Sequence, residues 1–129
     1  MAKRQRERAA KRKATADTRP SATAKYIGMG ASKAKRLLDI IRGIPYVQAV
    51  ATLENSDSMN AVDVKKVLIS AGANAENNKG LNKDDLYVAE CYANEGPTLK
   101  RGIFRGKGGW DRILKRTCHI TIILDVVKK

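Results

Sequence analysis

Basic and aromatic side chains are concentrated in one segment of this chain of 129 residues, residues 98–116. Seven of its side chains are Lys or Arg and one is acidic, and the only Phe and the only Trp of the chain, Phe104 and Trp110, lie within it. Guanidinium groups form bidentate bonds with phosphate, and aromatic rings stack on unpaired bases. The mixture is therefore suited to an anionic partner that also presents flat, apolar surfaces, which is the chemistry of a nucleic acid.

The arginines and glycines of this segment have separate expected roles. The side chains expected to bind phosphate in bidentate fashion, or to stack on bases, are Arg101, Arg105, Arg112 and Arg116. The positions that let the backbone approach a crowded partner are Gly102, Gly106, Gly108 and Gly109. Because stacking on splayed bases is typical of RNA loops rather than of regular duplex, the segment favours RNA. A solvated, flexible loop is the alternative.

Two further basic groups are consistent with the same partner. Lys33, Lys35 and Arg36 lie in the first turns of a predicted helix, where the helix dipole disfavours cations unless an anion compensates. The N-terminal candidates are Arg4, Arg6, Arg8, Lys11, Arg12 and Lys13. Residues 20–97 carry nine basic and nine acidic side chains, so the formal net charge of +13 lies mostly outside them. Such concentrated charge requires a polyanionic partner or full solvation.

The sequence predicts one small domain, residues 23–129, preceded by a basic tail, residues 1–22. The tail is too densely charged to present an apolar face, so we expect it to be disordered. Two cysteines in a chain of this length do not form a disulfide framework, which indicates a reducing compartment. The sequence has no run of about 18–20 apolar residues, which is the length needed to span a bilayer. Its N-terminal segment also lacks the apolar h-region of a secretory signal. An organellar transit peptide is a weaker alternative.

Apolar spacing predicts three helices. The first runs from an N-cap at Ser32 to about Arg42, with Ala34, Leu37, Leu38 and Ile41 on one face. The second begins near Pro45 or Tyr46, with Val47, Val50 and Ala51 inward. The third runs from near Met59 to about Asn78 and ends at a glycine signal, with its inward face at Ala61, Val64, Val67, Leu68, Ala71 and Ala75.

Strands are expected at residues 23–29, 86–93 and 117–127, the last with apolar side chains on one face and polar ones on the other. The strands at 86–93 and 117–127 flank the basic segment. The simplest topology joins them as one long antiparallel hairpin, whose extension covers residues 97–117 and turns near 106–109. A two-stranded ribbon of this length has no core of its own and is marginal in water, so it needs a partner surface.

Other functional classes receive little support. His119 is the only histidine and follows Cys118 in a predicted strand, so the two side chains point to opposite faces and cannot act as a catalytic pair. The acidic pair Asp84 and Asp85 is typical of a turn, and no glycine-rich phosphate-binding loop precedes a helix. The sequence predicts no metal or cofactor site, so we do not expect an enzyme. The main alternative is a basic RNA- or DNA-binding regulatory protein, although the hairpin lacks base-reading Asn or Gln. The hairpin glycines disfavour a membrane-surface helix.

Four motifs in order resemble the bacterial form of the ribosomal protein L twenty-two family. They are KAKRLLDIIRG at 33–43, NAENNKGLNKDDLYV at 74–88, NEGPTLKR at 94–101 and DRILKRTCHITIIL at 111–124. The resemblance covers about residues 23–127. It implies a small α+β body, with three helices packed on a three-stranded antiparallel sheet, and a long protruding β-hairpin.

The resemblance also implies a role and partners. It implies a structural constituent of the large ribosomal subunit, and a cytoplasmic ribosome is favoured over an organellar one. The protein would bind 23S rRNA and bridge the domains of this RNA during assembly. The hairpin would line the polypeptide exit tunnel beside the nascent polypeptide and near the macrolide site, among neighbouring ribosomal proteins. The implied hairpin contacts to rRNA are Lys100, Arg101, Arg105, Lys107, Arg112, Lys115 and Arg116. The tip, Arg105 to Trp110, would lie nearest the lumen.

The tip departs from the family pattern. Trp110 replaces a small residue, and Gly109 replaces a position that is often basic. The resemblance therefore carries no implication for the detailed contacts of the tip or for macrolide sensitivity.

Overall fold

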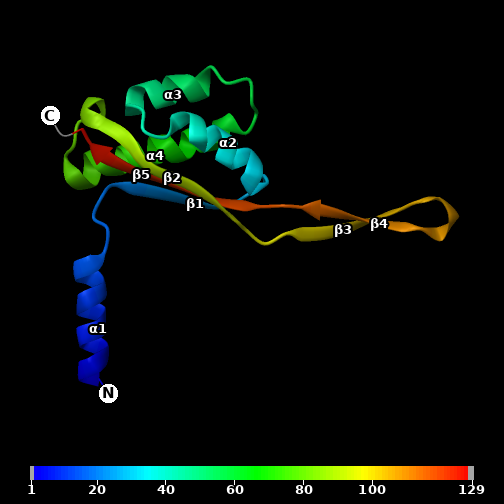
Figure 1. Cartoon of the computed structure of the whole chain (residues 1–129), viewed down its shortest axis with the longest axis horizontal. Helices are drawn as coiled ribbons and strands as arrows, with labels where there is room; N and C mark the ends of the chain where they lie inside the picture. Colours follow the sequence, from blue (N-terminus) through cyan, green and yellow to red (C-terminus); the bar gives the residue numbers. More distant parts are fainter. Residues whose placement is uncertain (1, 128–129) are drawn as a thin grey trace.

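The computed structural model describes residues 2–127 and has an α+β fold with a projecting hairpin (Figure 1). The helices are α1 (Ala2–Thr15), α2 (Ala31–Ile41), α3 (Tyr46–Glu54) and α4 (Ala61–Lys79), with short 3₁₀ turns η1 (Lys83–Asp85) and η2 (Gly106–Gly108). The strands are β1 (Ser21–Ile27), β2 (Leu86–Glu95), β3 (Leu99–Phe104), β4 (Trp110–Lys115) and β5 (Cys118–Val126). No helix within residues 2–127 has the length and apolar character needed to cross a bilayer.

The body is a three-stranded antiparallel sheet in the order β1-β5-β2, with α2, α3 and α4 on one side (Figure 1). Alternation along β5 turns four side chains into the core, and each is fully buried: Cys118, Ile120, Ile122 and Leu124. Helix α4 packs on β1 and β5, α2 packs on β2 and β5, and α3 packs against α4. The core is therefore the layer between the helices and one face of the sheet.

The predicted helical faces are confirmed for α2 and α4, because every apolar position named for them is buried. The prediction for α3 is wrong for Val47 and Ala51 and is confirmed in part for Val50, which packs against the core. Val47 and Ala51 are exposed and Val50 is half-buried, whereas Tyr46, Ala49 and Leu53 face the core. Two contacts set the rotation of this helix. Pro45 forms a β-bridge with Tyr87 of β2. The Tyr46 ring packs so closely on Gly72 that a Cβ added there would lie 2.5 Å from the Tyr46 hydroxyl oxygen.

Helix ends follow backbone geometry more than side-chain caps. The predicted N-cap Ser32 lies inside α2, whose N-cap is Gly30 without a side-chain cap bond. The predicted stop of α4 is confirmed, since Gly80 adopts a left-handed conformation with φ of 63° and its amide donates to the carbonyls of Ala75 and Glu76. This cap turns the chain toward η1 and β2.

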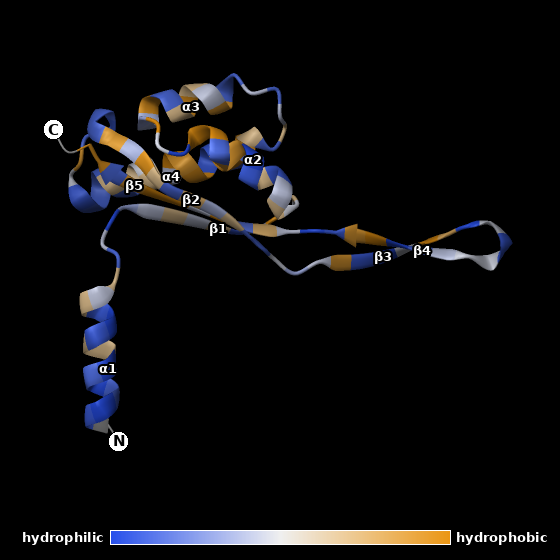
Figure 2. Ribbon diagram, viewed as in Figure 1, coloured by the Kyte–Doolittle hydropathy of each residue, from blue (hydrophilic) through white to orange (hydrophobic). Residues whose placement is uncertain are grey.

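The predicted hairpin is confirmed as an antiparallel ribbon in which β3 pairs with β4, from Leu99 opposite Lys115 to Phe104 opposite Trp110. It forms a separate two-stranded sheet, joined to the body through residues 96–98 and 116–117. Every residue from 99 to 116 is exposed. Figure 2 shows apolar and hydrophilic colours on both arms of this ribbon, far from the helices.

The fold-class prediction requires two corrections, although the α+β class is confirmed. Residues 2–127 contain four α-helices and five strands in two sheets, so the expected three helices on a three-stranded sheet describe the body but not everything that the structure describes. The expected disordered tail is wrong for Ala2–Thr15, which is the helix α1. Ala, Arg, Lys, Gln and Glu are strong helix formers, so local propensity gives a helix even without an apolar face. Side chains from Lys3 to Thr15 are all exposed, and α1 points away from the body (Figure 1).

Candidate nucleic-acid interface

The two faces of the hairpin both carry a mixture of cations and apolar groups. Pairing and alternation place Leu99, Arg101, Ile103, Asp111, Ile113 and Lys115 on one face. The other face carries Lys100, Gly102, Phe104, Trp110, Arg112 and Leu114. Since all of these residues are exposed, the body covers neither face. The ribbon therefore offers a partner two sides, each able to make ionic and apolar contacts.

The two aromatic side chains of the hairpin have different surroundings. The Trp110 indole lies directly over the backbone of Gly102, so closely that a Cβ at that position would overlap the ring. Trp110 is consequently 53% exposed, while Phe104 opposite it is 91% exposed. Only a residue without a side chain leaves room for this packing. Phe104 is thus the ring freely available for stacking, and Trp110 also stabilises the ribbon itself.

The tip is a tight turn closed by its own contacts. The amide of Arg105 donates to the carbonyl of Gly109 at 2.8 Å, and that of Gly109 donates to Gly106 at 3.3 Å. Lys107 and Gly108 both have positive φ, 57° and 72°. The Arg105 guanidinium forms an ion pair with Asp111 at 2.5 Å. Part of the Arg105 charge is therefore already compensated within the hairpin.

None of the other six hairpin cations has an acidic partner within residues 2–127. The unpaired ones are Lys100, Arg101, Lys107, Arg112, Lys115 and Arg116; Arg101 donates only to the Lys100 carbonyl, at 3.0 Å. Long unpaired cations beside exposed apolar groups repel one another and are favourably neutralised by phosphates. The structure thus gathers these six predicted contact residues on one protrusion.

Only one of the three predicted cations of α2 lies beside the hairpin cations. Lys33 lines a cleft at the root of the hairpin, together with Lys115 and Arg116. Lys35 and Arg36 are exposed on α2 but do not line this cleft. The fold therefore places Lys33 beside Lys115 and Arg116, although it lies 82 and 83 residues before them in sequence.

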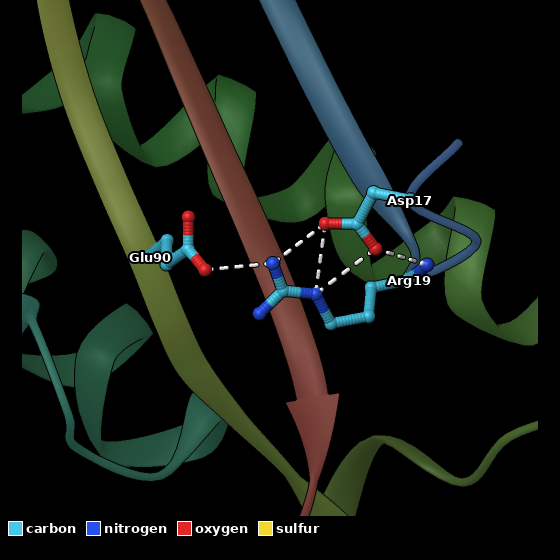
Figure 3. Close-up of polar contacts among 3 residues, drawn as sticks. All are labelled: Asp17, Arg19 and Glu90. Atoms are coloured by element: carbon cyan, nitrogen blue, oxygen red, sulfur yellow. Dashed lines mark hydrogen bonds and ion pairs between the residues drawn. The ribbon is translucent and has the colours of Figure 1, made fainter. Parts of the chain in front are cut away.

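The predicted N-terminal contacts all lie on the exposed helix α1. A link that sequence reasoning missed joins the chain after α1 to the body. Arg19 donates to Asp17 through Nε at 2.9 Å and through Nη2 at 2.6 Å, and Nη2 also donates to Glu90 of β2 at 2.7 Å (Figure 3). These bonds hold the pKa of Asp17 at about 2 and raise that of Arg19. The only sequence signal was the i, i+2 spacing of opposite charges.

His119 and the cysteines serve structural purposes. Cys91 and Cys118 are free and buried, and burial raises the pKa of both thiols. His119 Nδ1 accepts a hydrogen bond from the Tyr26 amide at 3.0 Å, and the two rings meet edge to face with centroids 4.8 Å apart. This contact fixes Tyr26 at a positive φ of 57°, where β1 contains a bulge. Within residues 2–127 no group of three potential ligands is placed to hold a metal ion.

Known proteins are similar to this chain over most of its length. The family model described as Ribosomal protein L22p/L17e matches residues 22–125. The chain is 46% identical over 114 residues to the large ribosomal subunit protein uL22 of Lachnospira eligens, covering 88% of this chain and 89% of that protein. It is 47% identical over 109 residues to that of Ligilactobacillus salivarius, covering 84% and 95%. For Cutibacterium acnes the identity is 40% over 121 residues, covering 92% and 79%.

The chain is therefore a ribosomal protein, of a structural and non-enzymatic class. It belongs to the L22p/L17e family, which confirms the resemblance drawn from the four sequence motifs.

Proposed function

We propose that this protein is a structural constituent of the large subunit of the cytoplasmic ribosome, where its hairpin binds large-subunit rRNA. The body would sit on the RNA surface, and the ribbon would extend between RNA domains and hold them together during assembly. Its tip would line the polypeptide exit tunnel beside the nascent chain. Neighbouring ribosomal proteins would complete its surroundings.

One observation carries the proposal: the two-stranded ribbon, residues 99–115, has no covered face and bears unpaired cations on both sides. An isolated ribbon gains little from its own packing, so a surface that lies against both faces supplies most of its order. Folded RNA provides such a surface, because phosphates can neutralise the cations and unpaired bases can stack on Phe104. Names of the relatives place them in the large ribosomal subunit, which supports the same location for this chain.

The exposed helix α1 supports a second attachment to RNA. It carries seven Lys and Arg residues between Lys3 and Lys13 and one acidic residue, Glu7. Repulsion between like charges four residues apart, as for Arg4 and Arg8, disfavours the free helix. Phosphates along an RNA groove remove that repulsion, so we expect α1 to bind RNA as a helix.

The test is incorporation into large subunits in cells that express a tagged copy. We expect the wild-type protein to co-sediment with large subunits through high salt and to be released when the RNA is digested. A variant with Lys100, Arg101 and Arg112 changed to Gln should incorporate less well while keeping a folded body. A matched control changes Lys65, Lys66 and Lys79 on α4 to Gln, and should incorporate normally. Wild-type protein that never enters large subunits would contradict the proposal.

A further inference from the structure

The body and the hairpin together form a cleft where they join. It has a volume of about 660 Å³, and its walls come from the loop between β1 and α2, the start of α2, Asn60 before α4 and the hairpin root. Volumes of about 300–1,000 Å³ are typical of sites that hold a small organic group. A cleft of this size is larger than a single phosphate needs.

Three cations from separate parts of the chain line this cleft. Lys33 comes from α2, while Lys115 and Arg116 come from the end of the hairpin. No carboxylate lines it, and none of the three has an acidic partner within residues 2–127. Arg116 reaches across to the body, since its Cδ lies 3.9 Å from the place a Cβ on Gly30 would occupy. The cleft is therefore a site of uncompensated positive charge.

The remaining walls have a different character. Met29, which is 5% exposed, and the hairpin residues Leu99 and Leu114 contribute apolar surface. The N-terminal end of α2 has no side-chain cap, so its positive end adds to the field of the cations. Charge and apolar surface in one cavity match a ligand that has both an anionic and a flat apolar part.

We infer that this cleft binds one unpaired nucleotide of an RNA strand, with its phosphate on Lys33, Lys115 and Arg116 and its base against the apolar wall. The inference rests on the proposed RNA-binding function and assigns a particular site within it. A bound nucleotide would contact body and hairpin at once. It would thereby fix the direction of the ribbon, whose root is otherwise held by bonds such as Gly96 N–H to the Thr117 carbonyl at 2.9 Å.

The probe is a single-stranded RNA of four uridines, titrated into the full-length protein and followed by amide NMR shifts. We expect the largest shifts at Gly28, Gly30 and Thr117. The Lys33→Gln, Lys115→Gln, Arg116→Gln variant should bind about tenfold more weakly. The Lys65→Gln, Lys66→Gln, Lys79→Gln variant removes equal charge on α4, outside both the cleft and the hairpin, and should weaken binding less than about threefold. An abasic strand of the same length should bind about fivefold more weakly than the uridine strand.

Different failures have different meanings. Equal weakening in the two triple variants, or shifts spread along the hairpin without the cleft, would overturn the cleft assignment. Equal affinity for the abasic strand would overturn the role of the apolar wall. If these occur while wild-type protein still binds large-subunit rRNA, the proposed function stands and the nucleotide site falls. Absence of any binding to rRNA would instead overturn the proposed function.

Discussion

Strands β4 and β5 are neighbours in the chain, separated only by Arg116 and Thr117, yet they lie in opposite environments. Along β5 every second side chain is apolar, so four of the five side chains on one face are fully buried, and Val126 at its end is half-buried. Along β4 the apolar residues Ile113 and Leu114 are adjacent and therefore point to opposite faces. A body could bury one face of such a strand but not both. The body folds by internal burial, whereas the hairpin requires an external surface.

Amide exchange should show the largest difference between these regions. Amides of Ile120, Ile122 and Leu124 in the body should be protected by several orders of magnitude, approaching the free energy of global unfolding. Amides of Gly102 and Ile113 in the free protein should exchange rapidly, because the ribbon contains no fully buried side chain to resist local opening. Binding of large-subunit rRNA should protect the hairpin. Strong hairpin protection without RNA would contradict this difference between the two regions.

The same substitution in each region gives the next test. Ile122→Ala should lower the free energy of unfolding by about 2–5 kcal/mol, because Ile122 is fully buried in β5. Ile103→Ala, at a residue 45% exposed in the hairpin, should change it by less than about 0.5 kcal/mol. Denaturant titration of both variants measures the difference. Equal destabilisation would mean that hairpin and body unfold as one unit.

Charge removal should affect binding in the hairpin and not in the body. Changing Lys100, Arg101 and Arg112 to Gln should lower the slope of log affinity against log salt by about 0.7–0.9 for each phosphate that the hairpin no longer neutralises. The variant with Lys65, Lys66 and Lys79 changed should keep its slope, which makes it the matched control. Filter binding to rRNA across a salt series measures both. An unchanged slope in the hairpin variant would exclude phosphate binding by those three side chains.

The fold was predictable wherever one period of apolar spacing was unambiguous. The faces of α2, α4 and β5 follow directly from their sequences. Helix α3 has apolar residues at several phases, so only tertiary contacts, Pro45 with Tyr87 and Tyr46 with Gly72, decide its rotation. Helix α1 was missed because the expectation relied on an apolar face and overlooked the helical propensity of its residues.

The candidate site was predictable in composition but not in grouping. The density of Lys and Arg in the sequence was enough to predict the hairpin cations, because this prediction does not depend on which residues lie nearby in the fold. Grouping Lys33 with Arg116 required the fold, because the two residues approach only when the hairpin root meets α2. The pairing of Arg105 with Asp111 and the position of Trp110 on Gly102 depend on strand register, which the sequence alone left open.

Within the hairpin, the contact of Trp110 with Gly102 should be the main intrinsic stabiliser. Gly102→Ala places a methyl group where the indole lies and should expose the ring. Trp110 is the only tryptophan, so its fluorescence maximum should shift to longer wavelength, while thermal unfolding of the body changes little. Gly106→Ala is the control, because a Cβ there meets nothing within 4 Å. Identical spectra for wild type and Gly102→Ala would show that the indole is not held there.

The smallest expected effect concerns Arg19, which ties the end of α1 to the body. The pKa of Asp17 is lowered from 3.8 to about 2. The stabilisation that its ion pair with Arg19 provides is therefore present above pH 4 and is lost as the pH falls toward 2. Because these side chains are exposed, the thermal midpoint should hardly change across this range, but residual dipolar couplings should show α1 losing its fixed direction. Arg19→Gln should give that looser state at neutral pH. Lys66→Gln, which removes an exposed pair with Asp63 within α4, should not. An α1 direction that is independent of pH and of Arg19 would show that other contacts hold this helix.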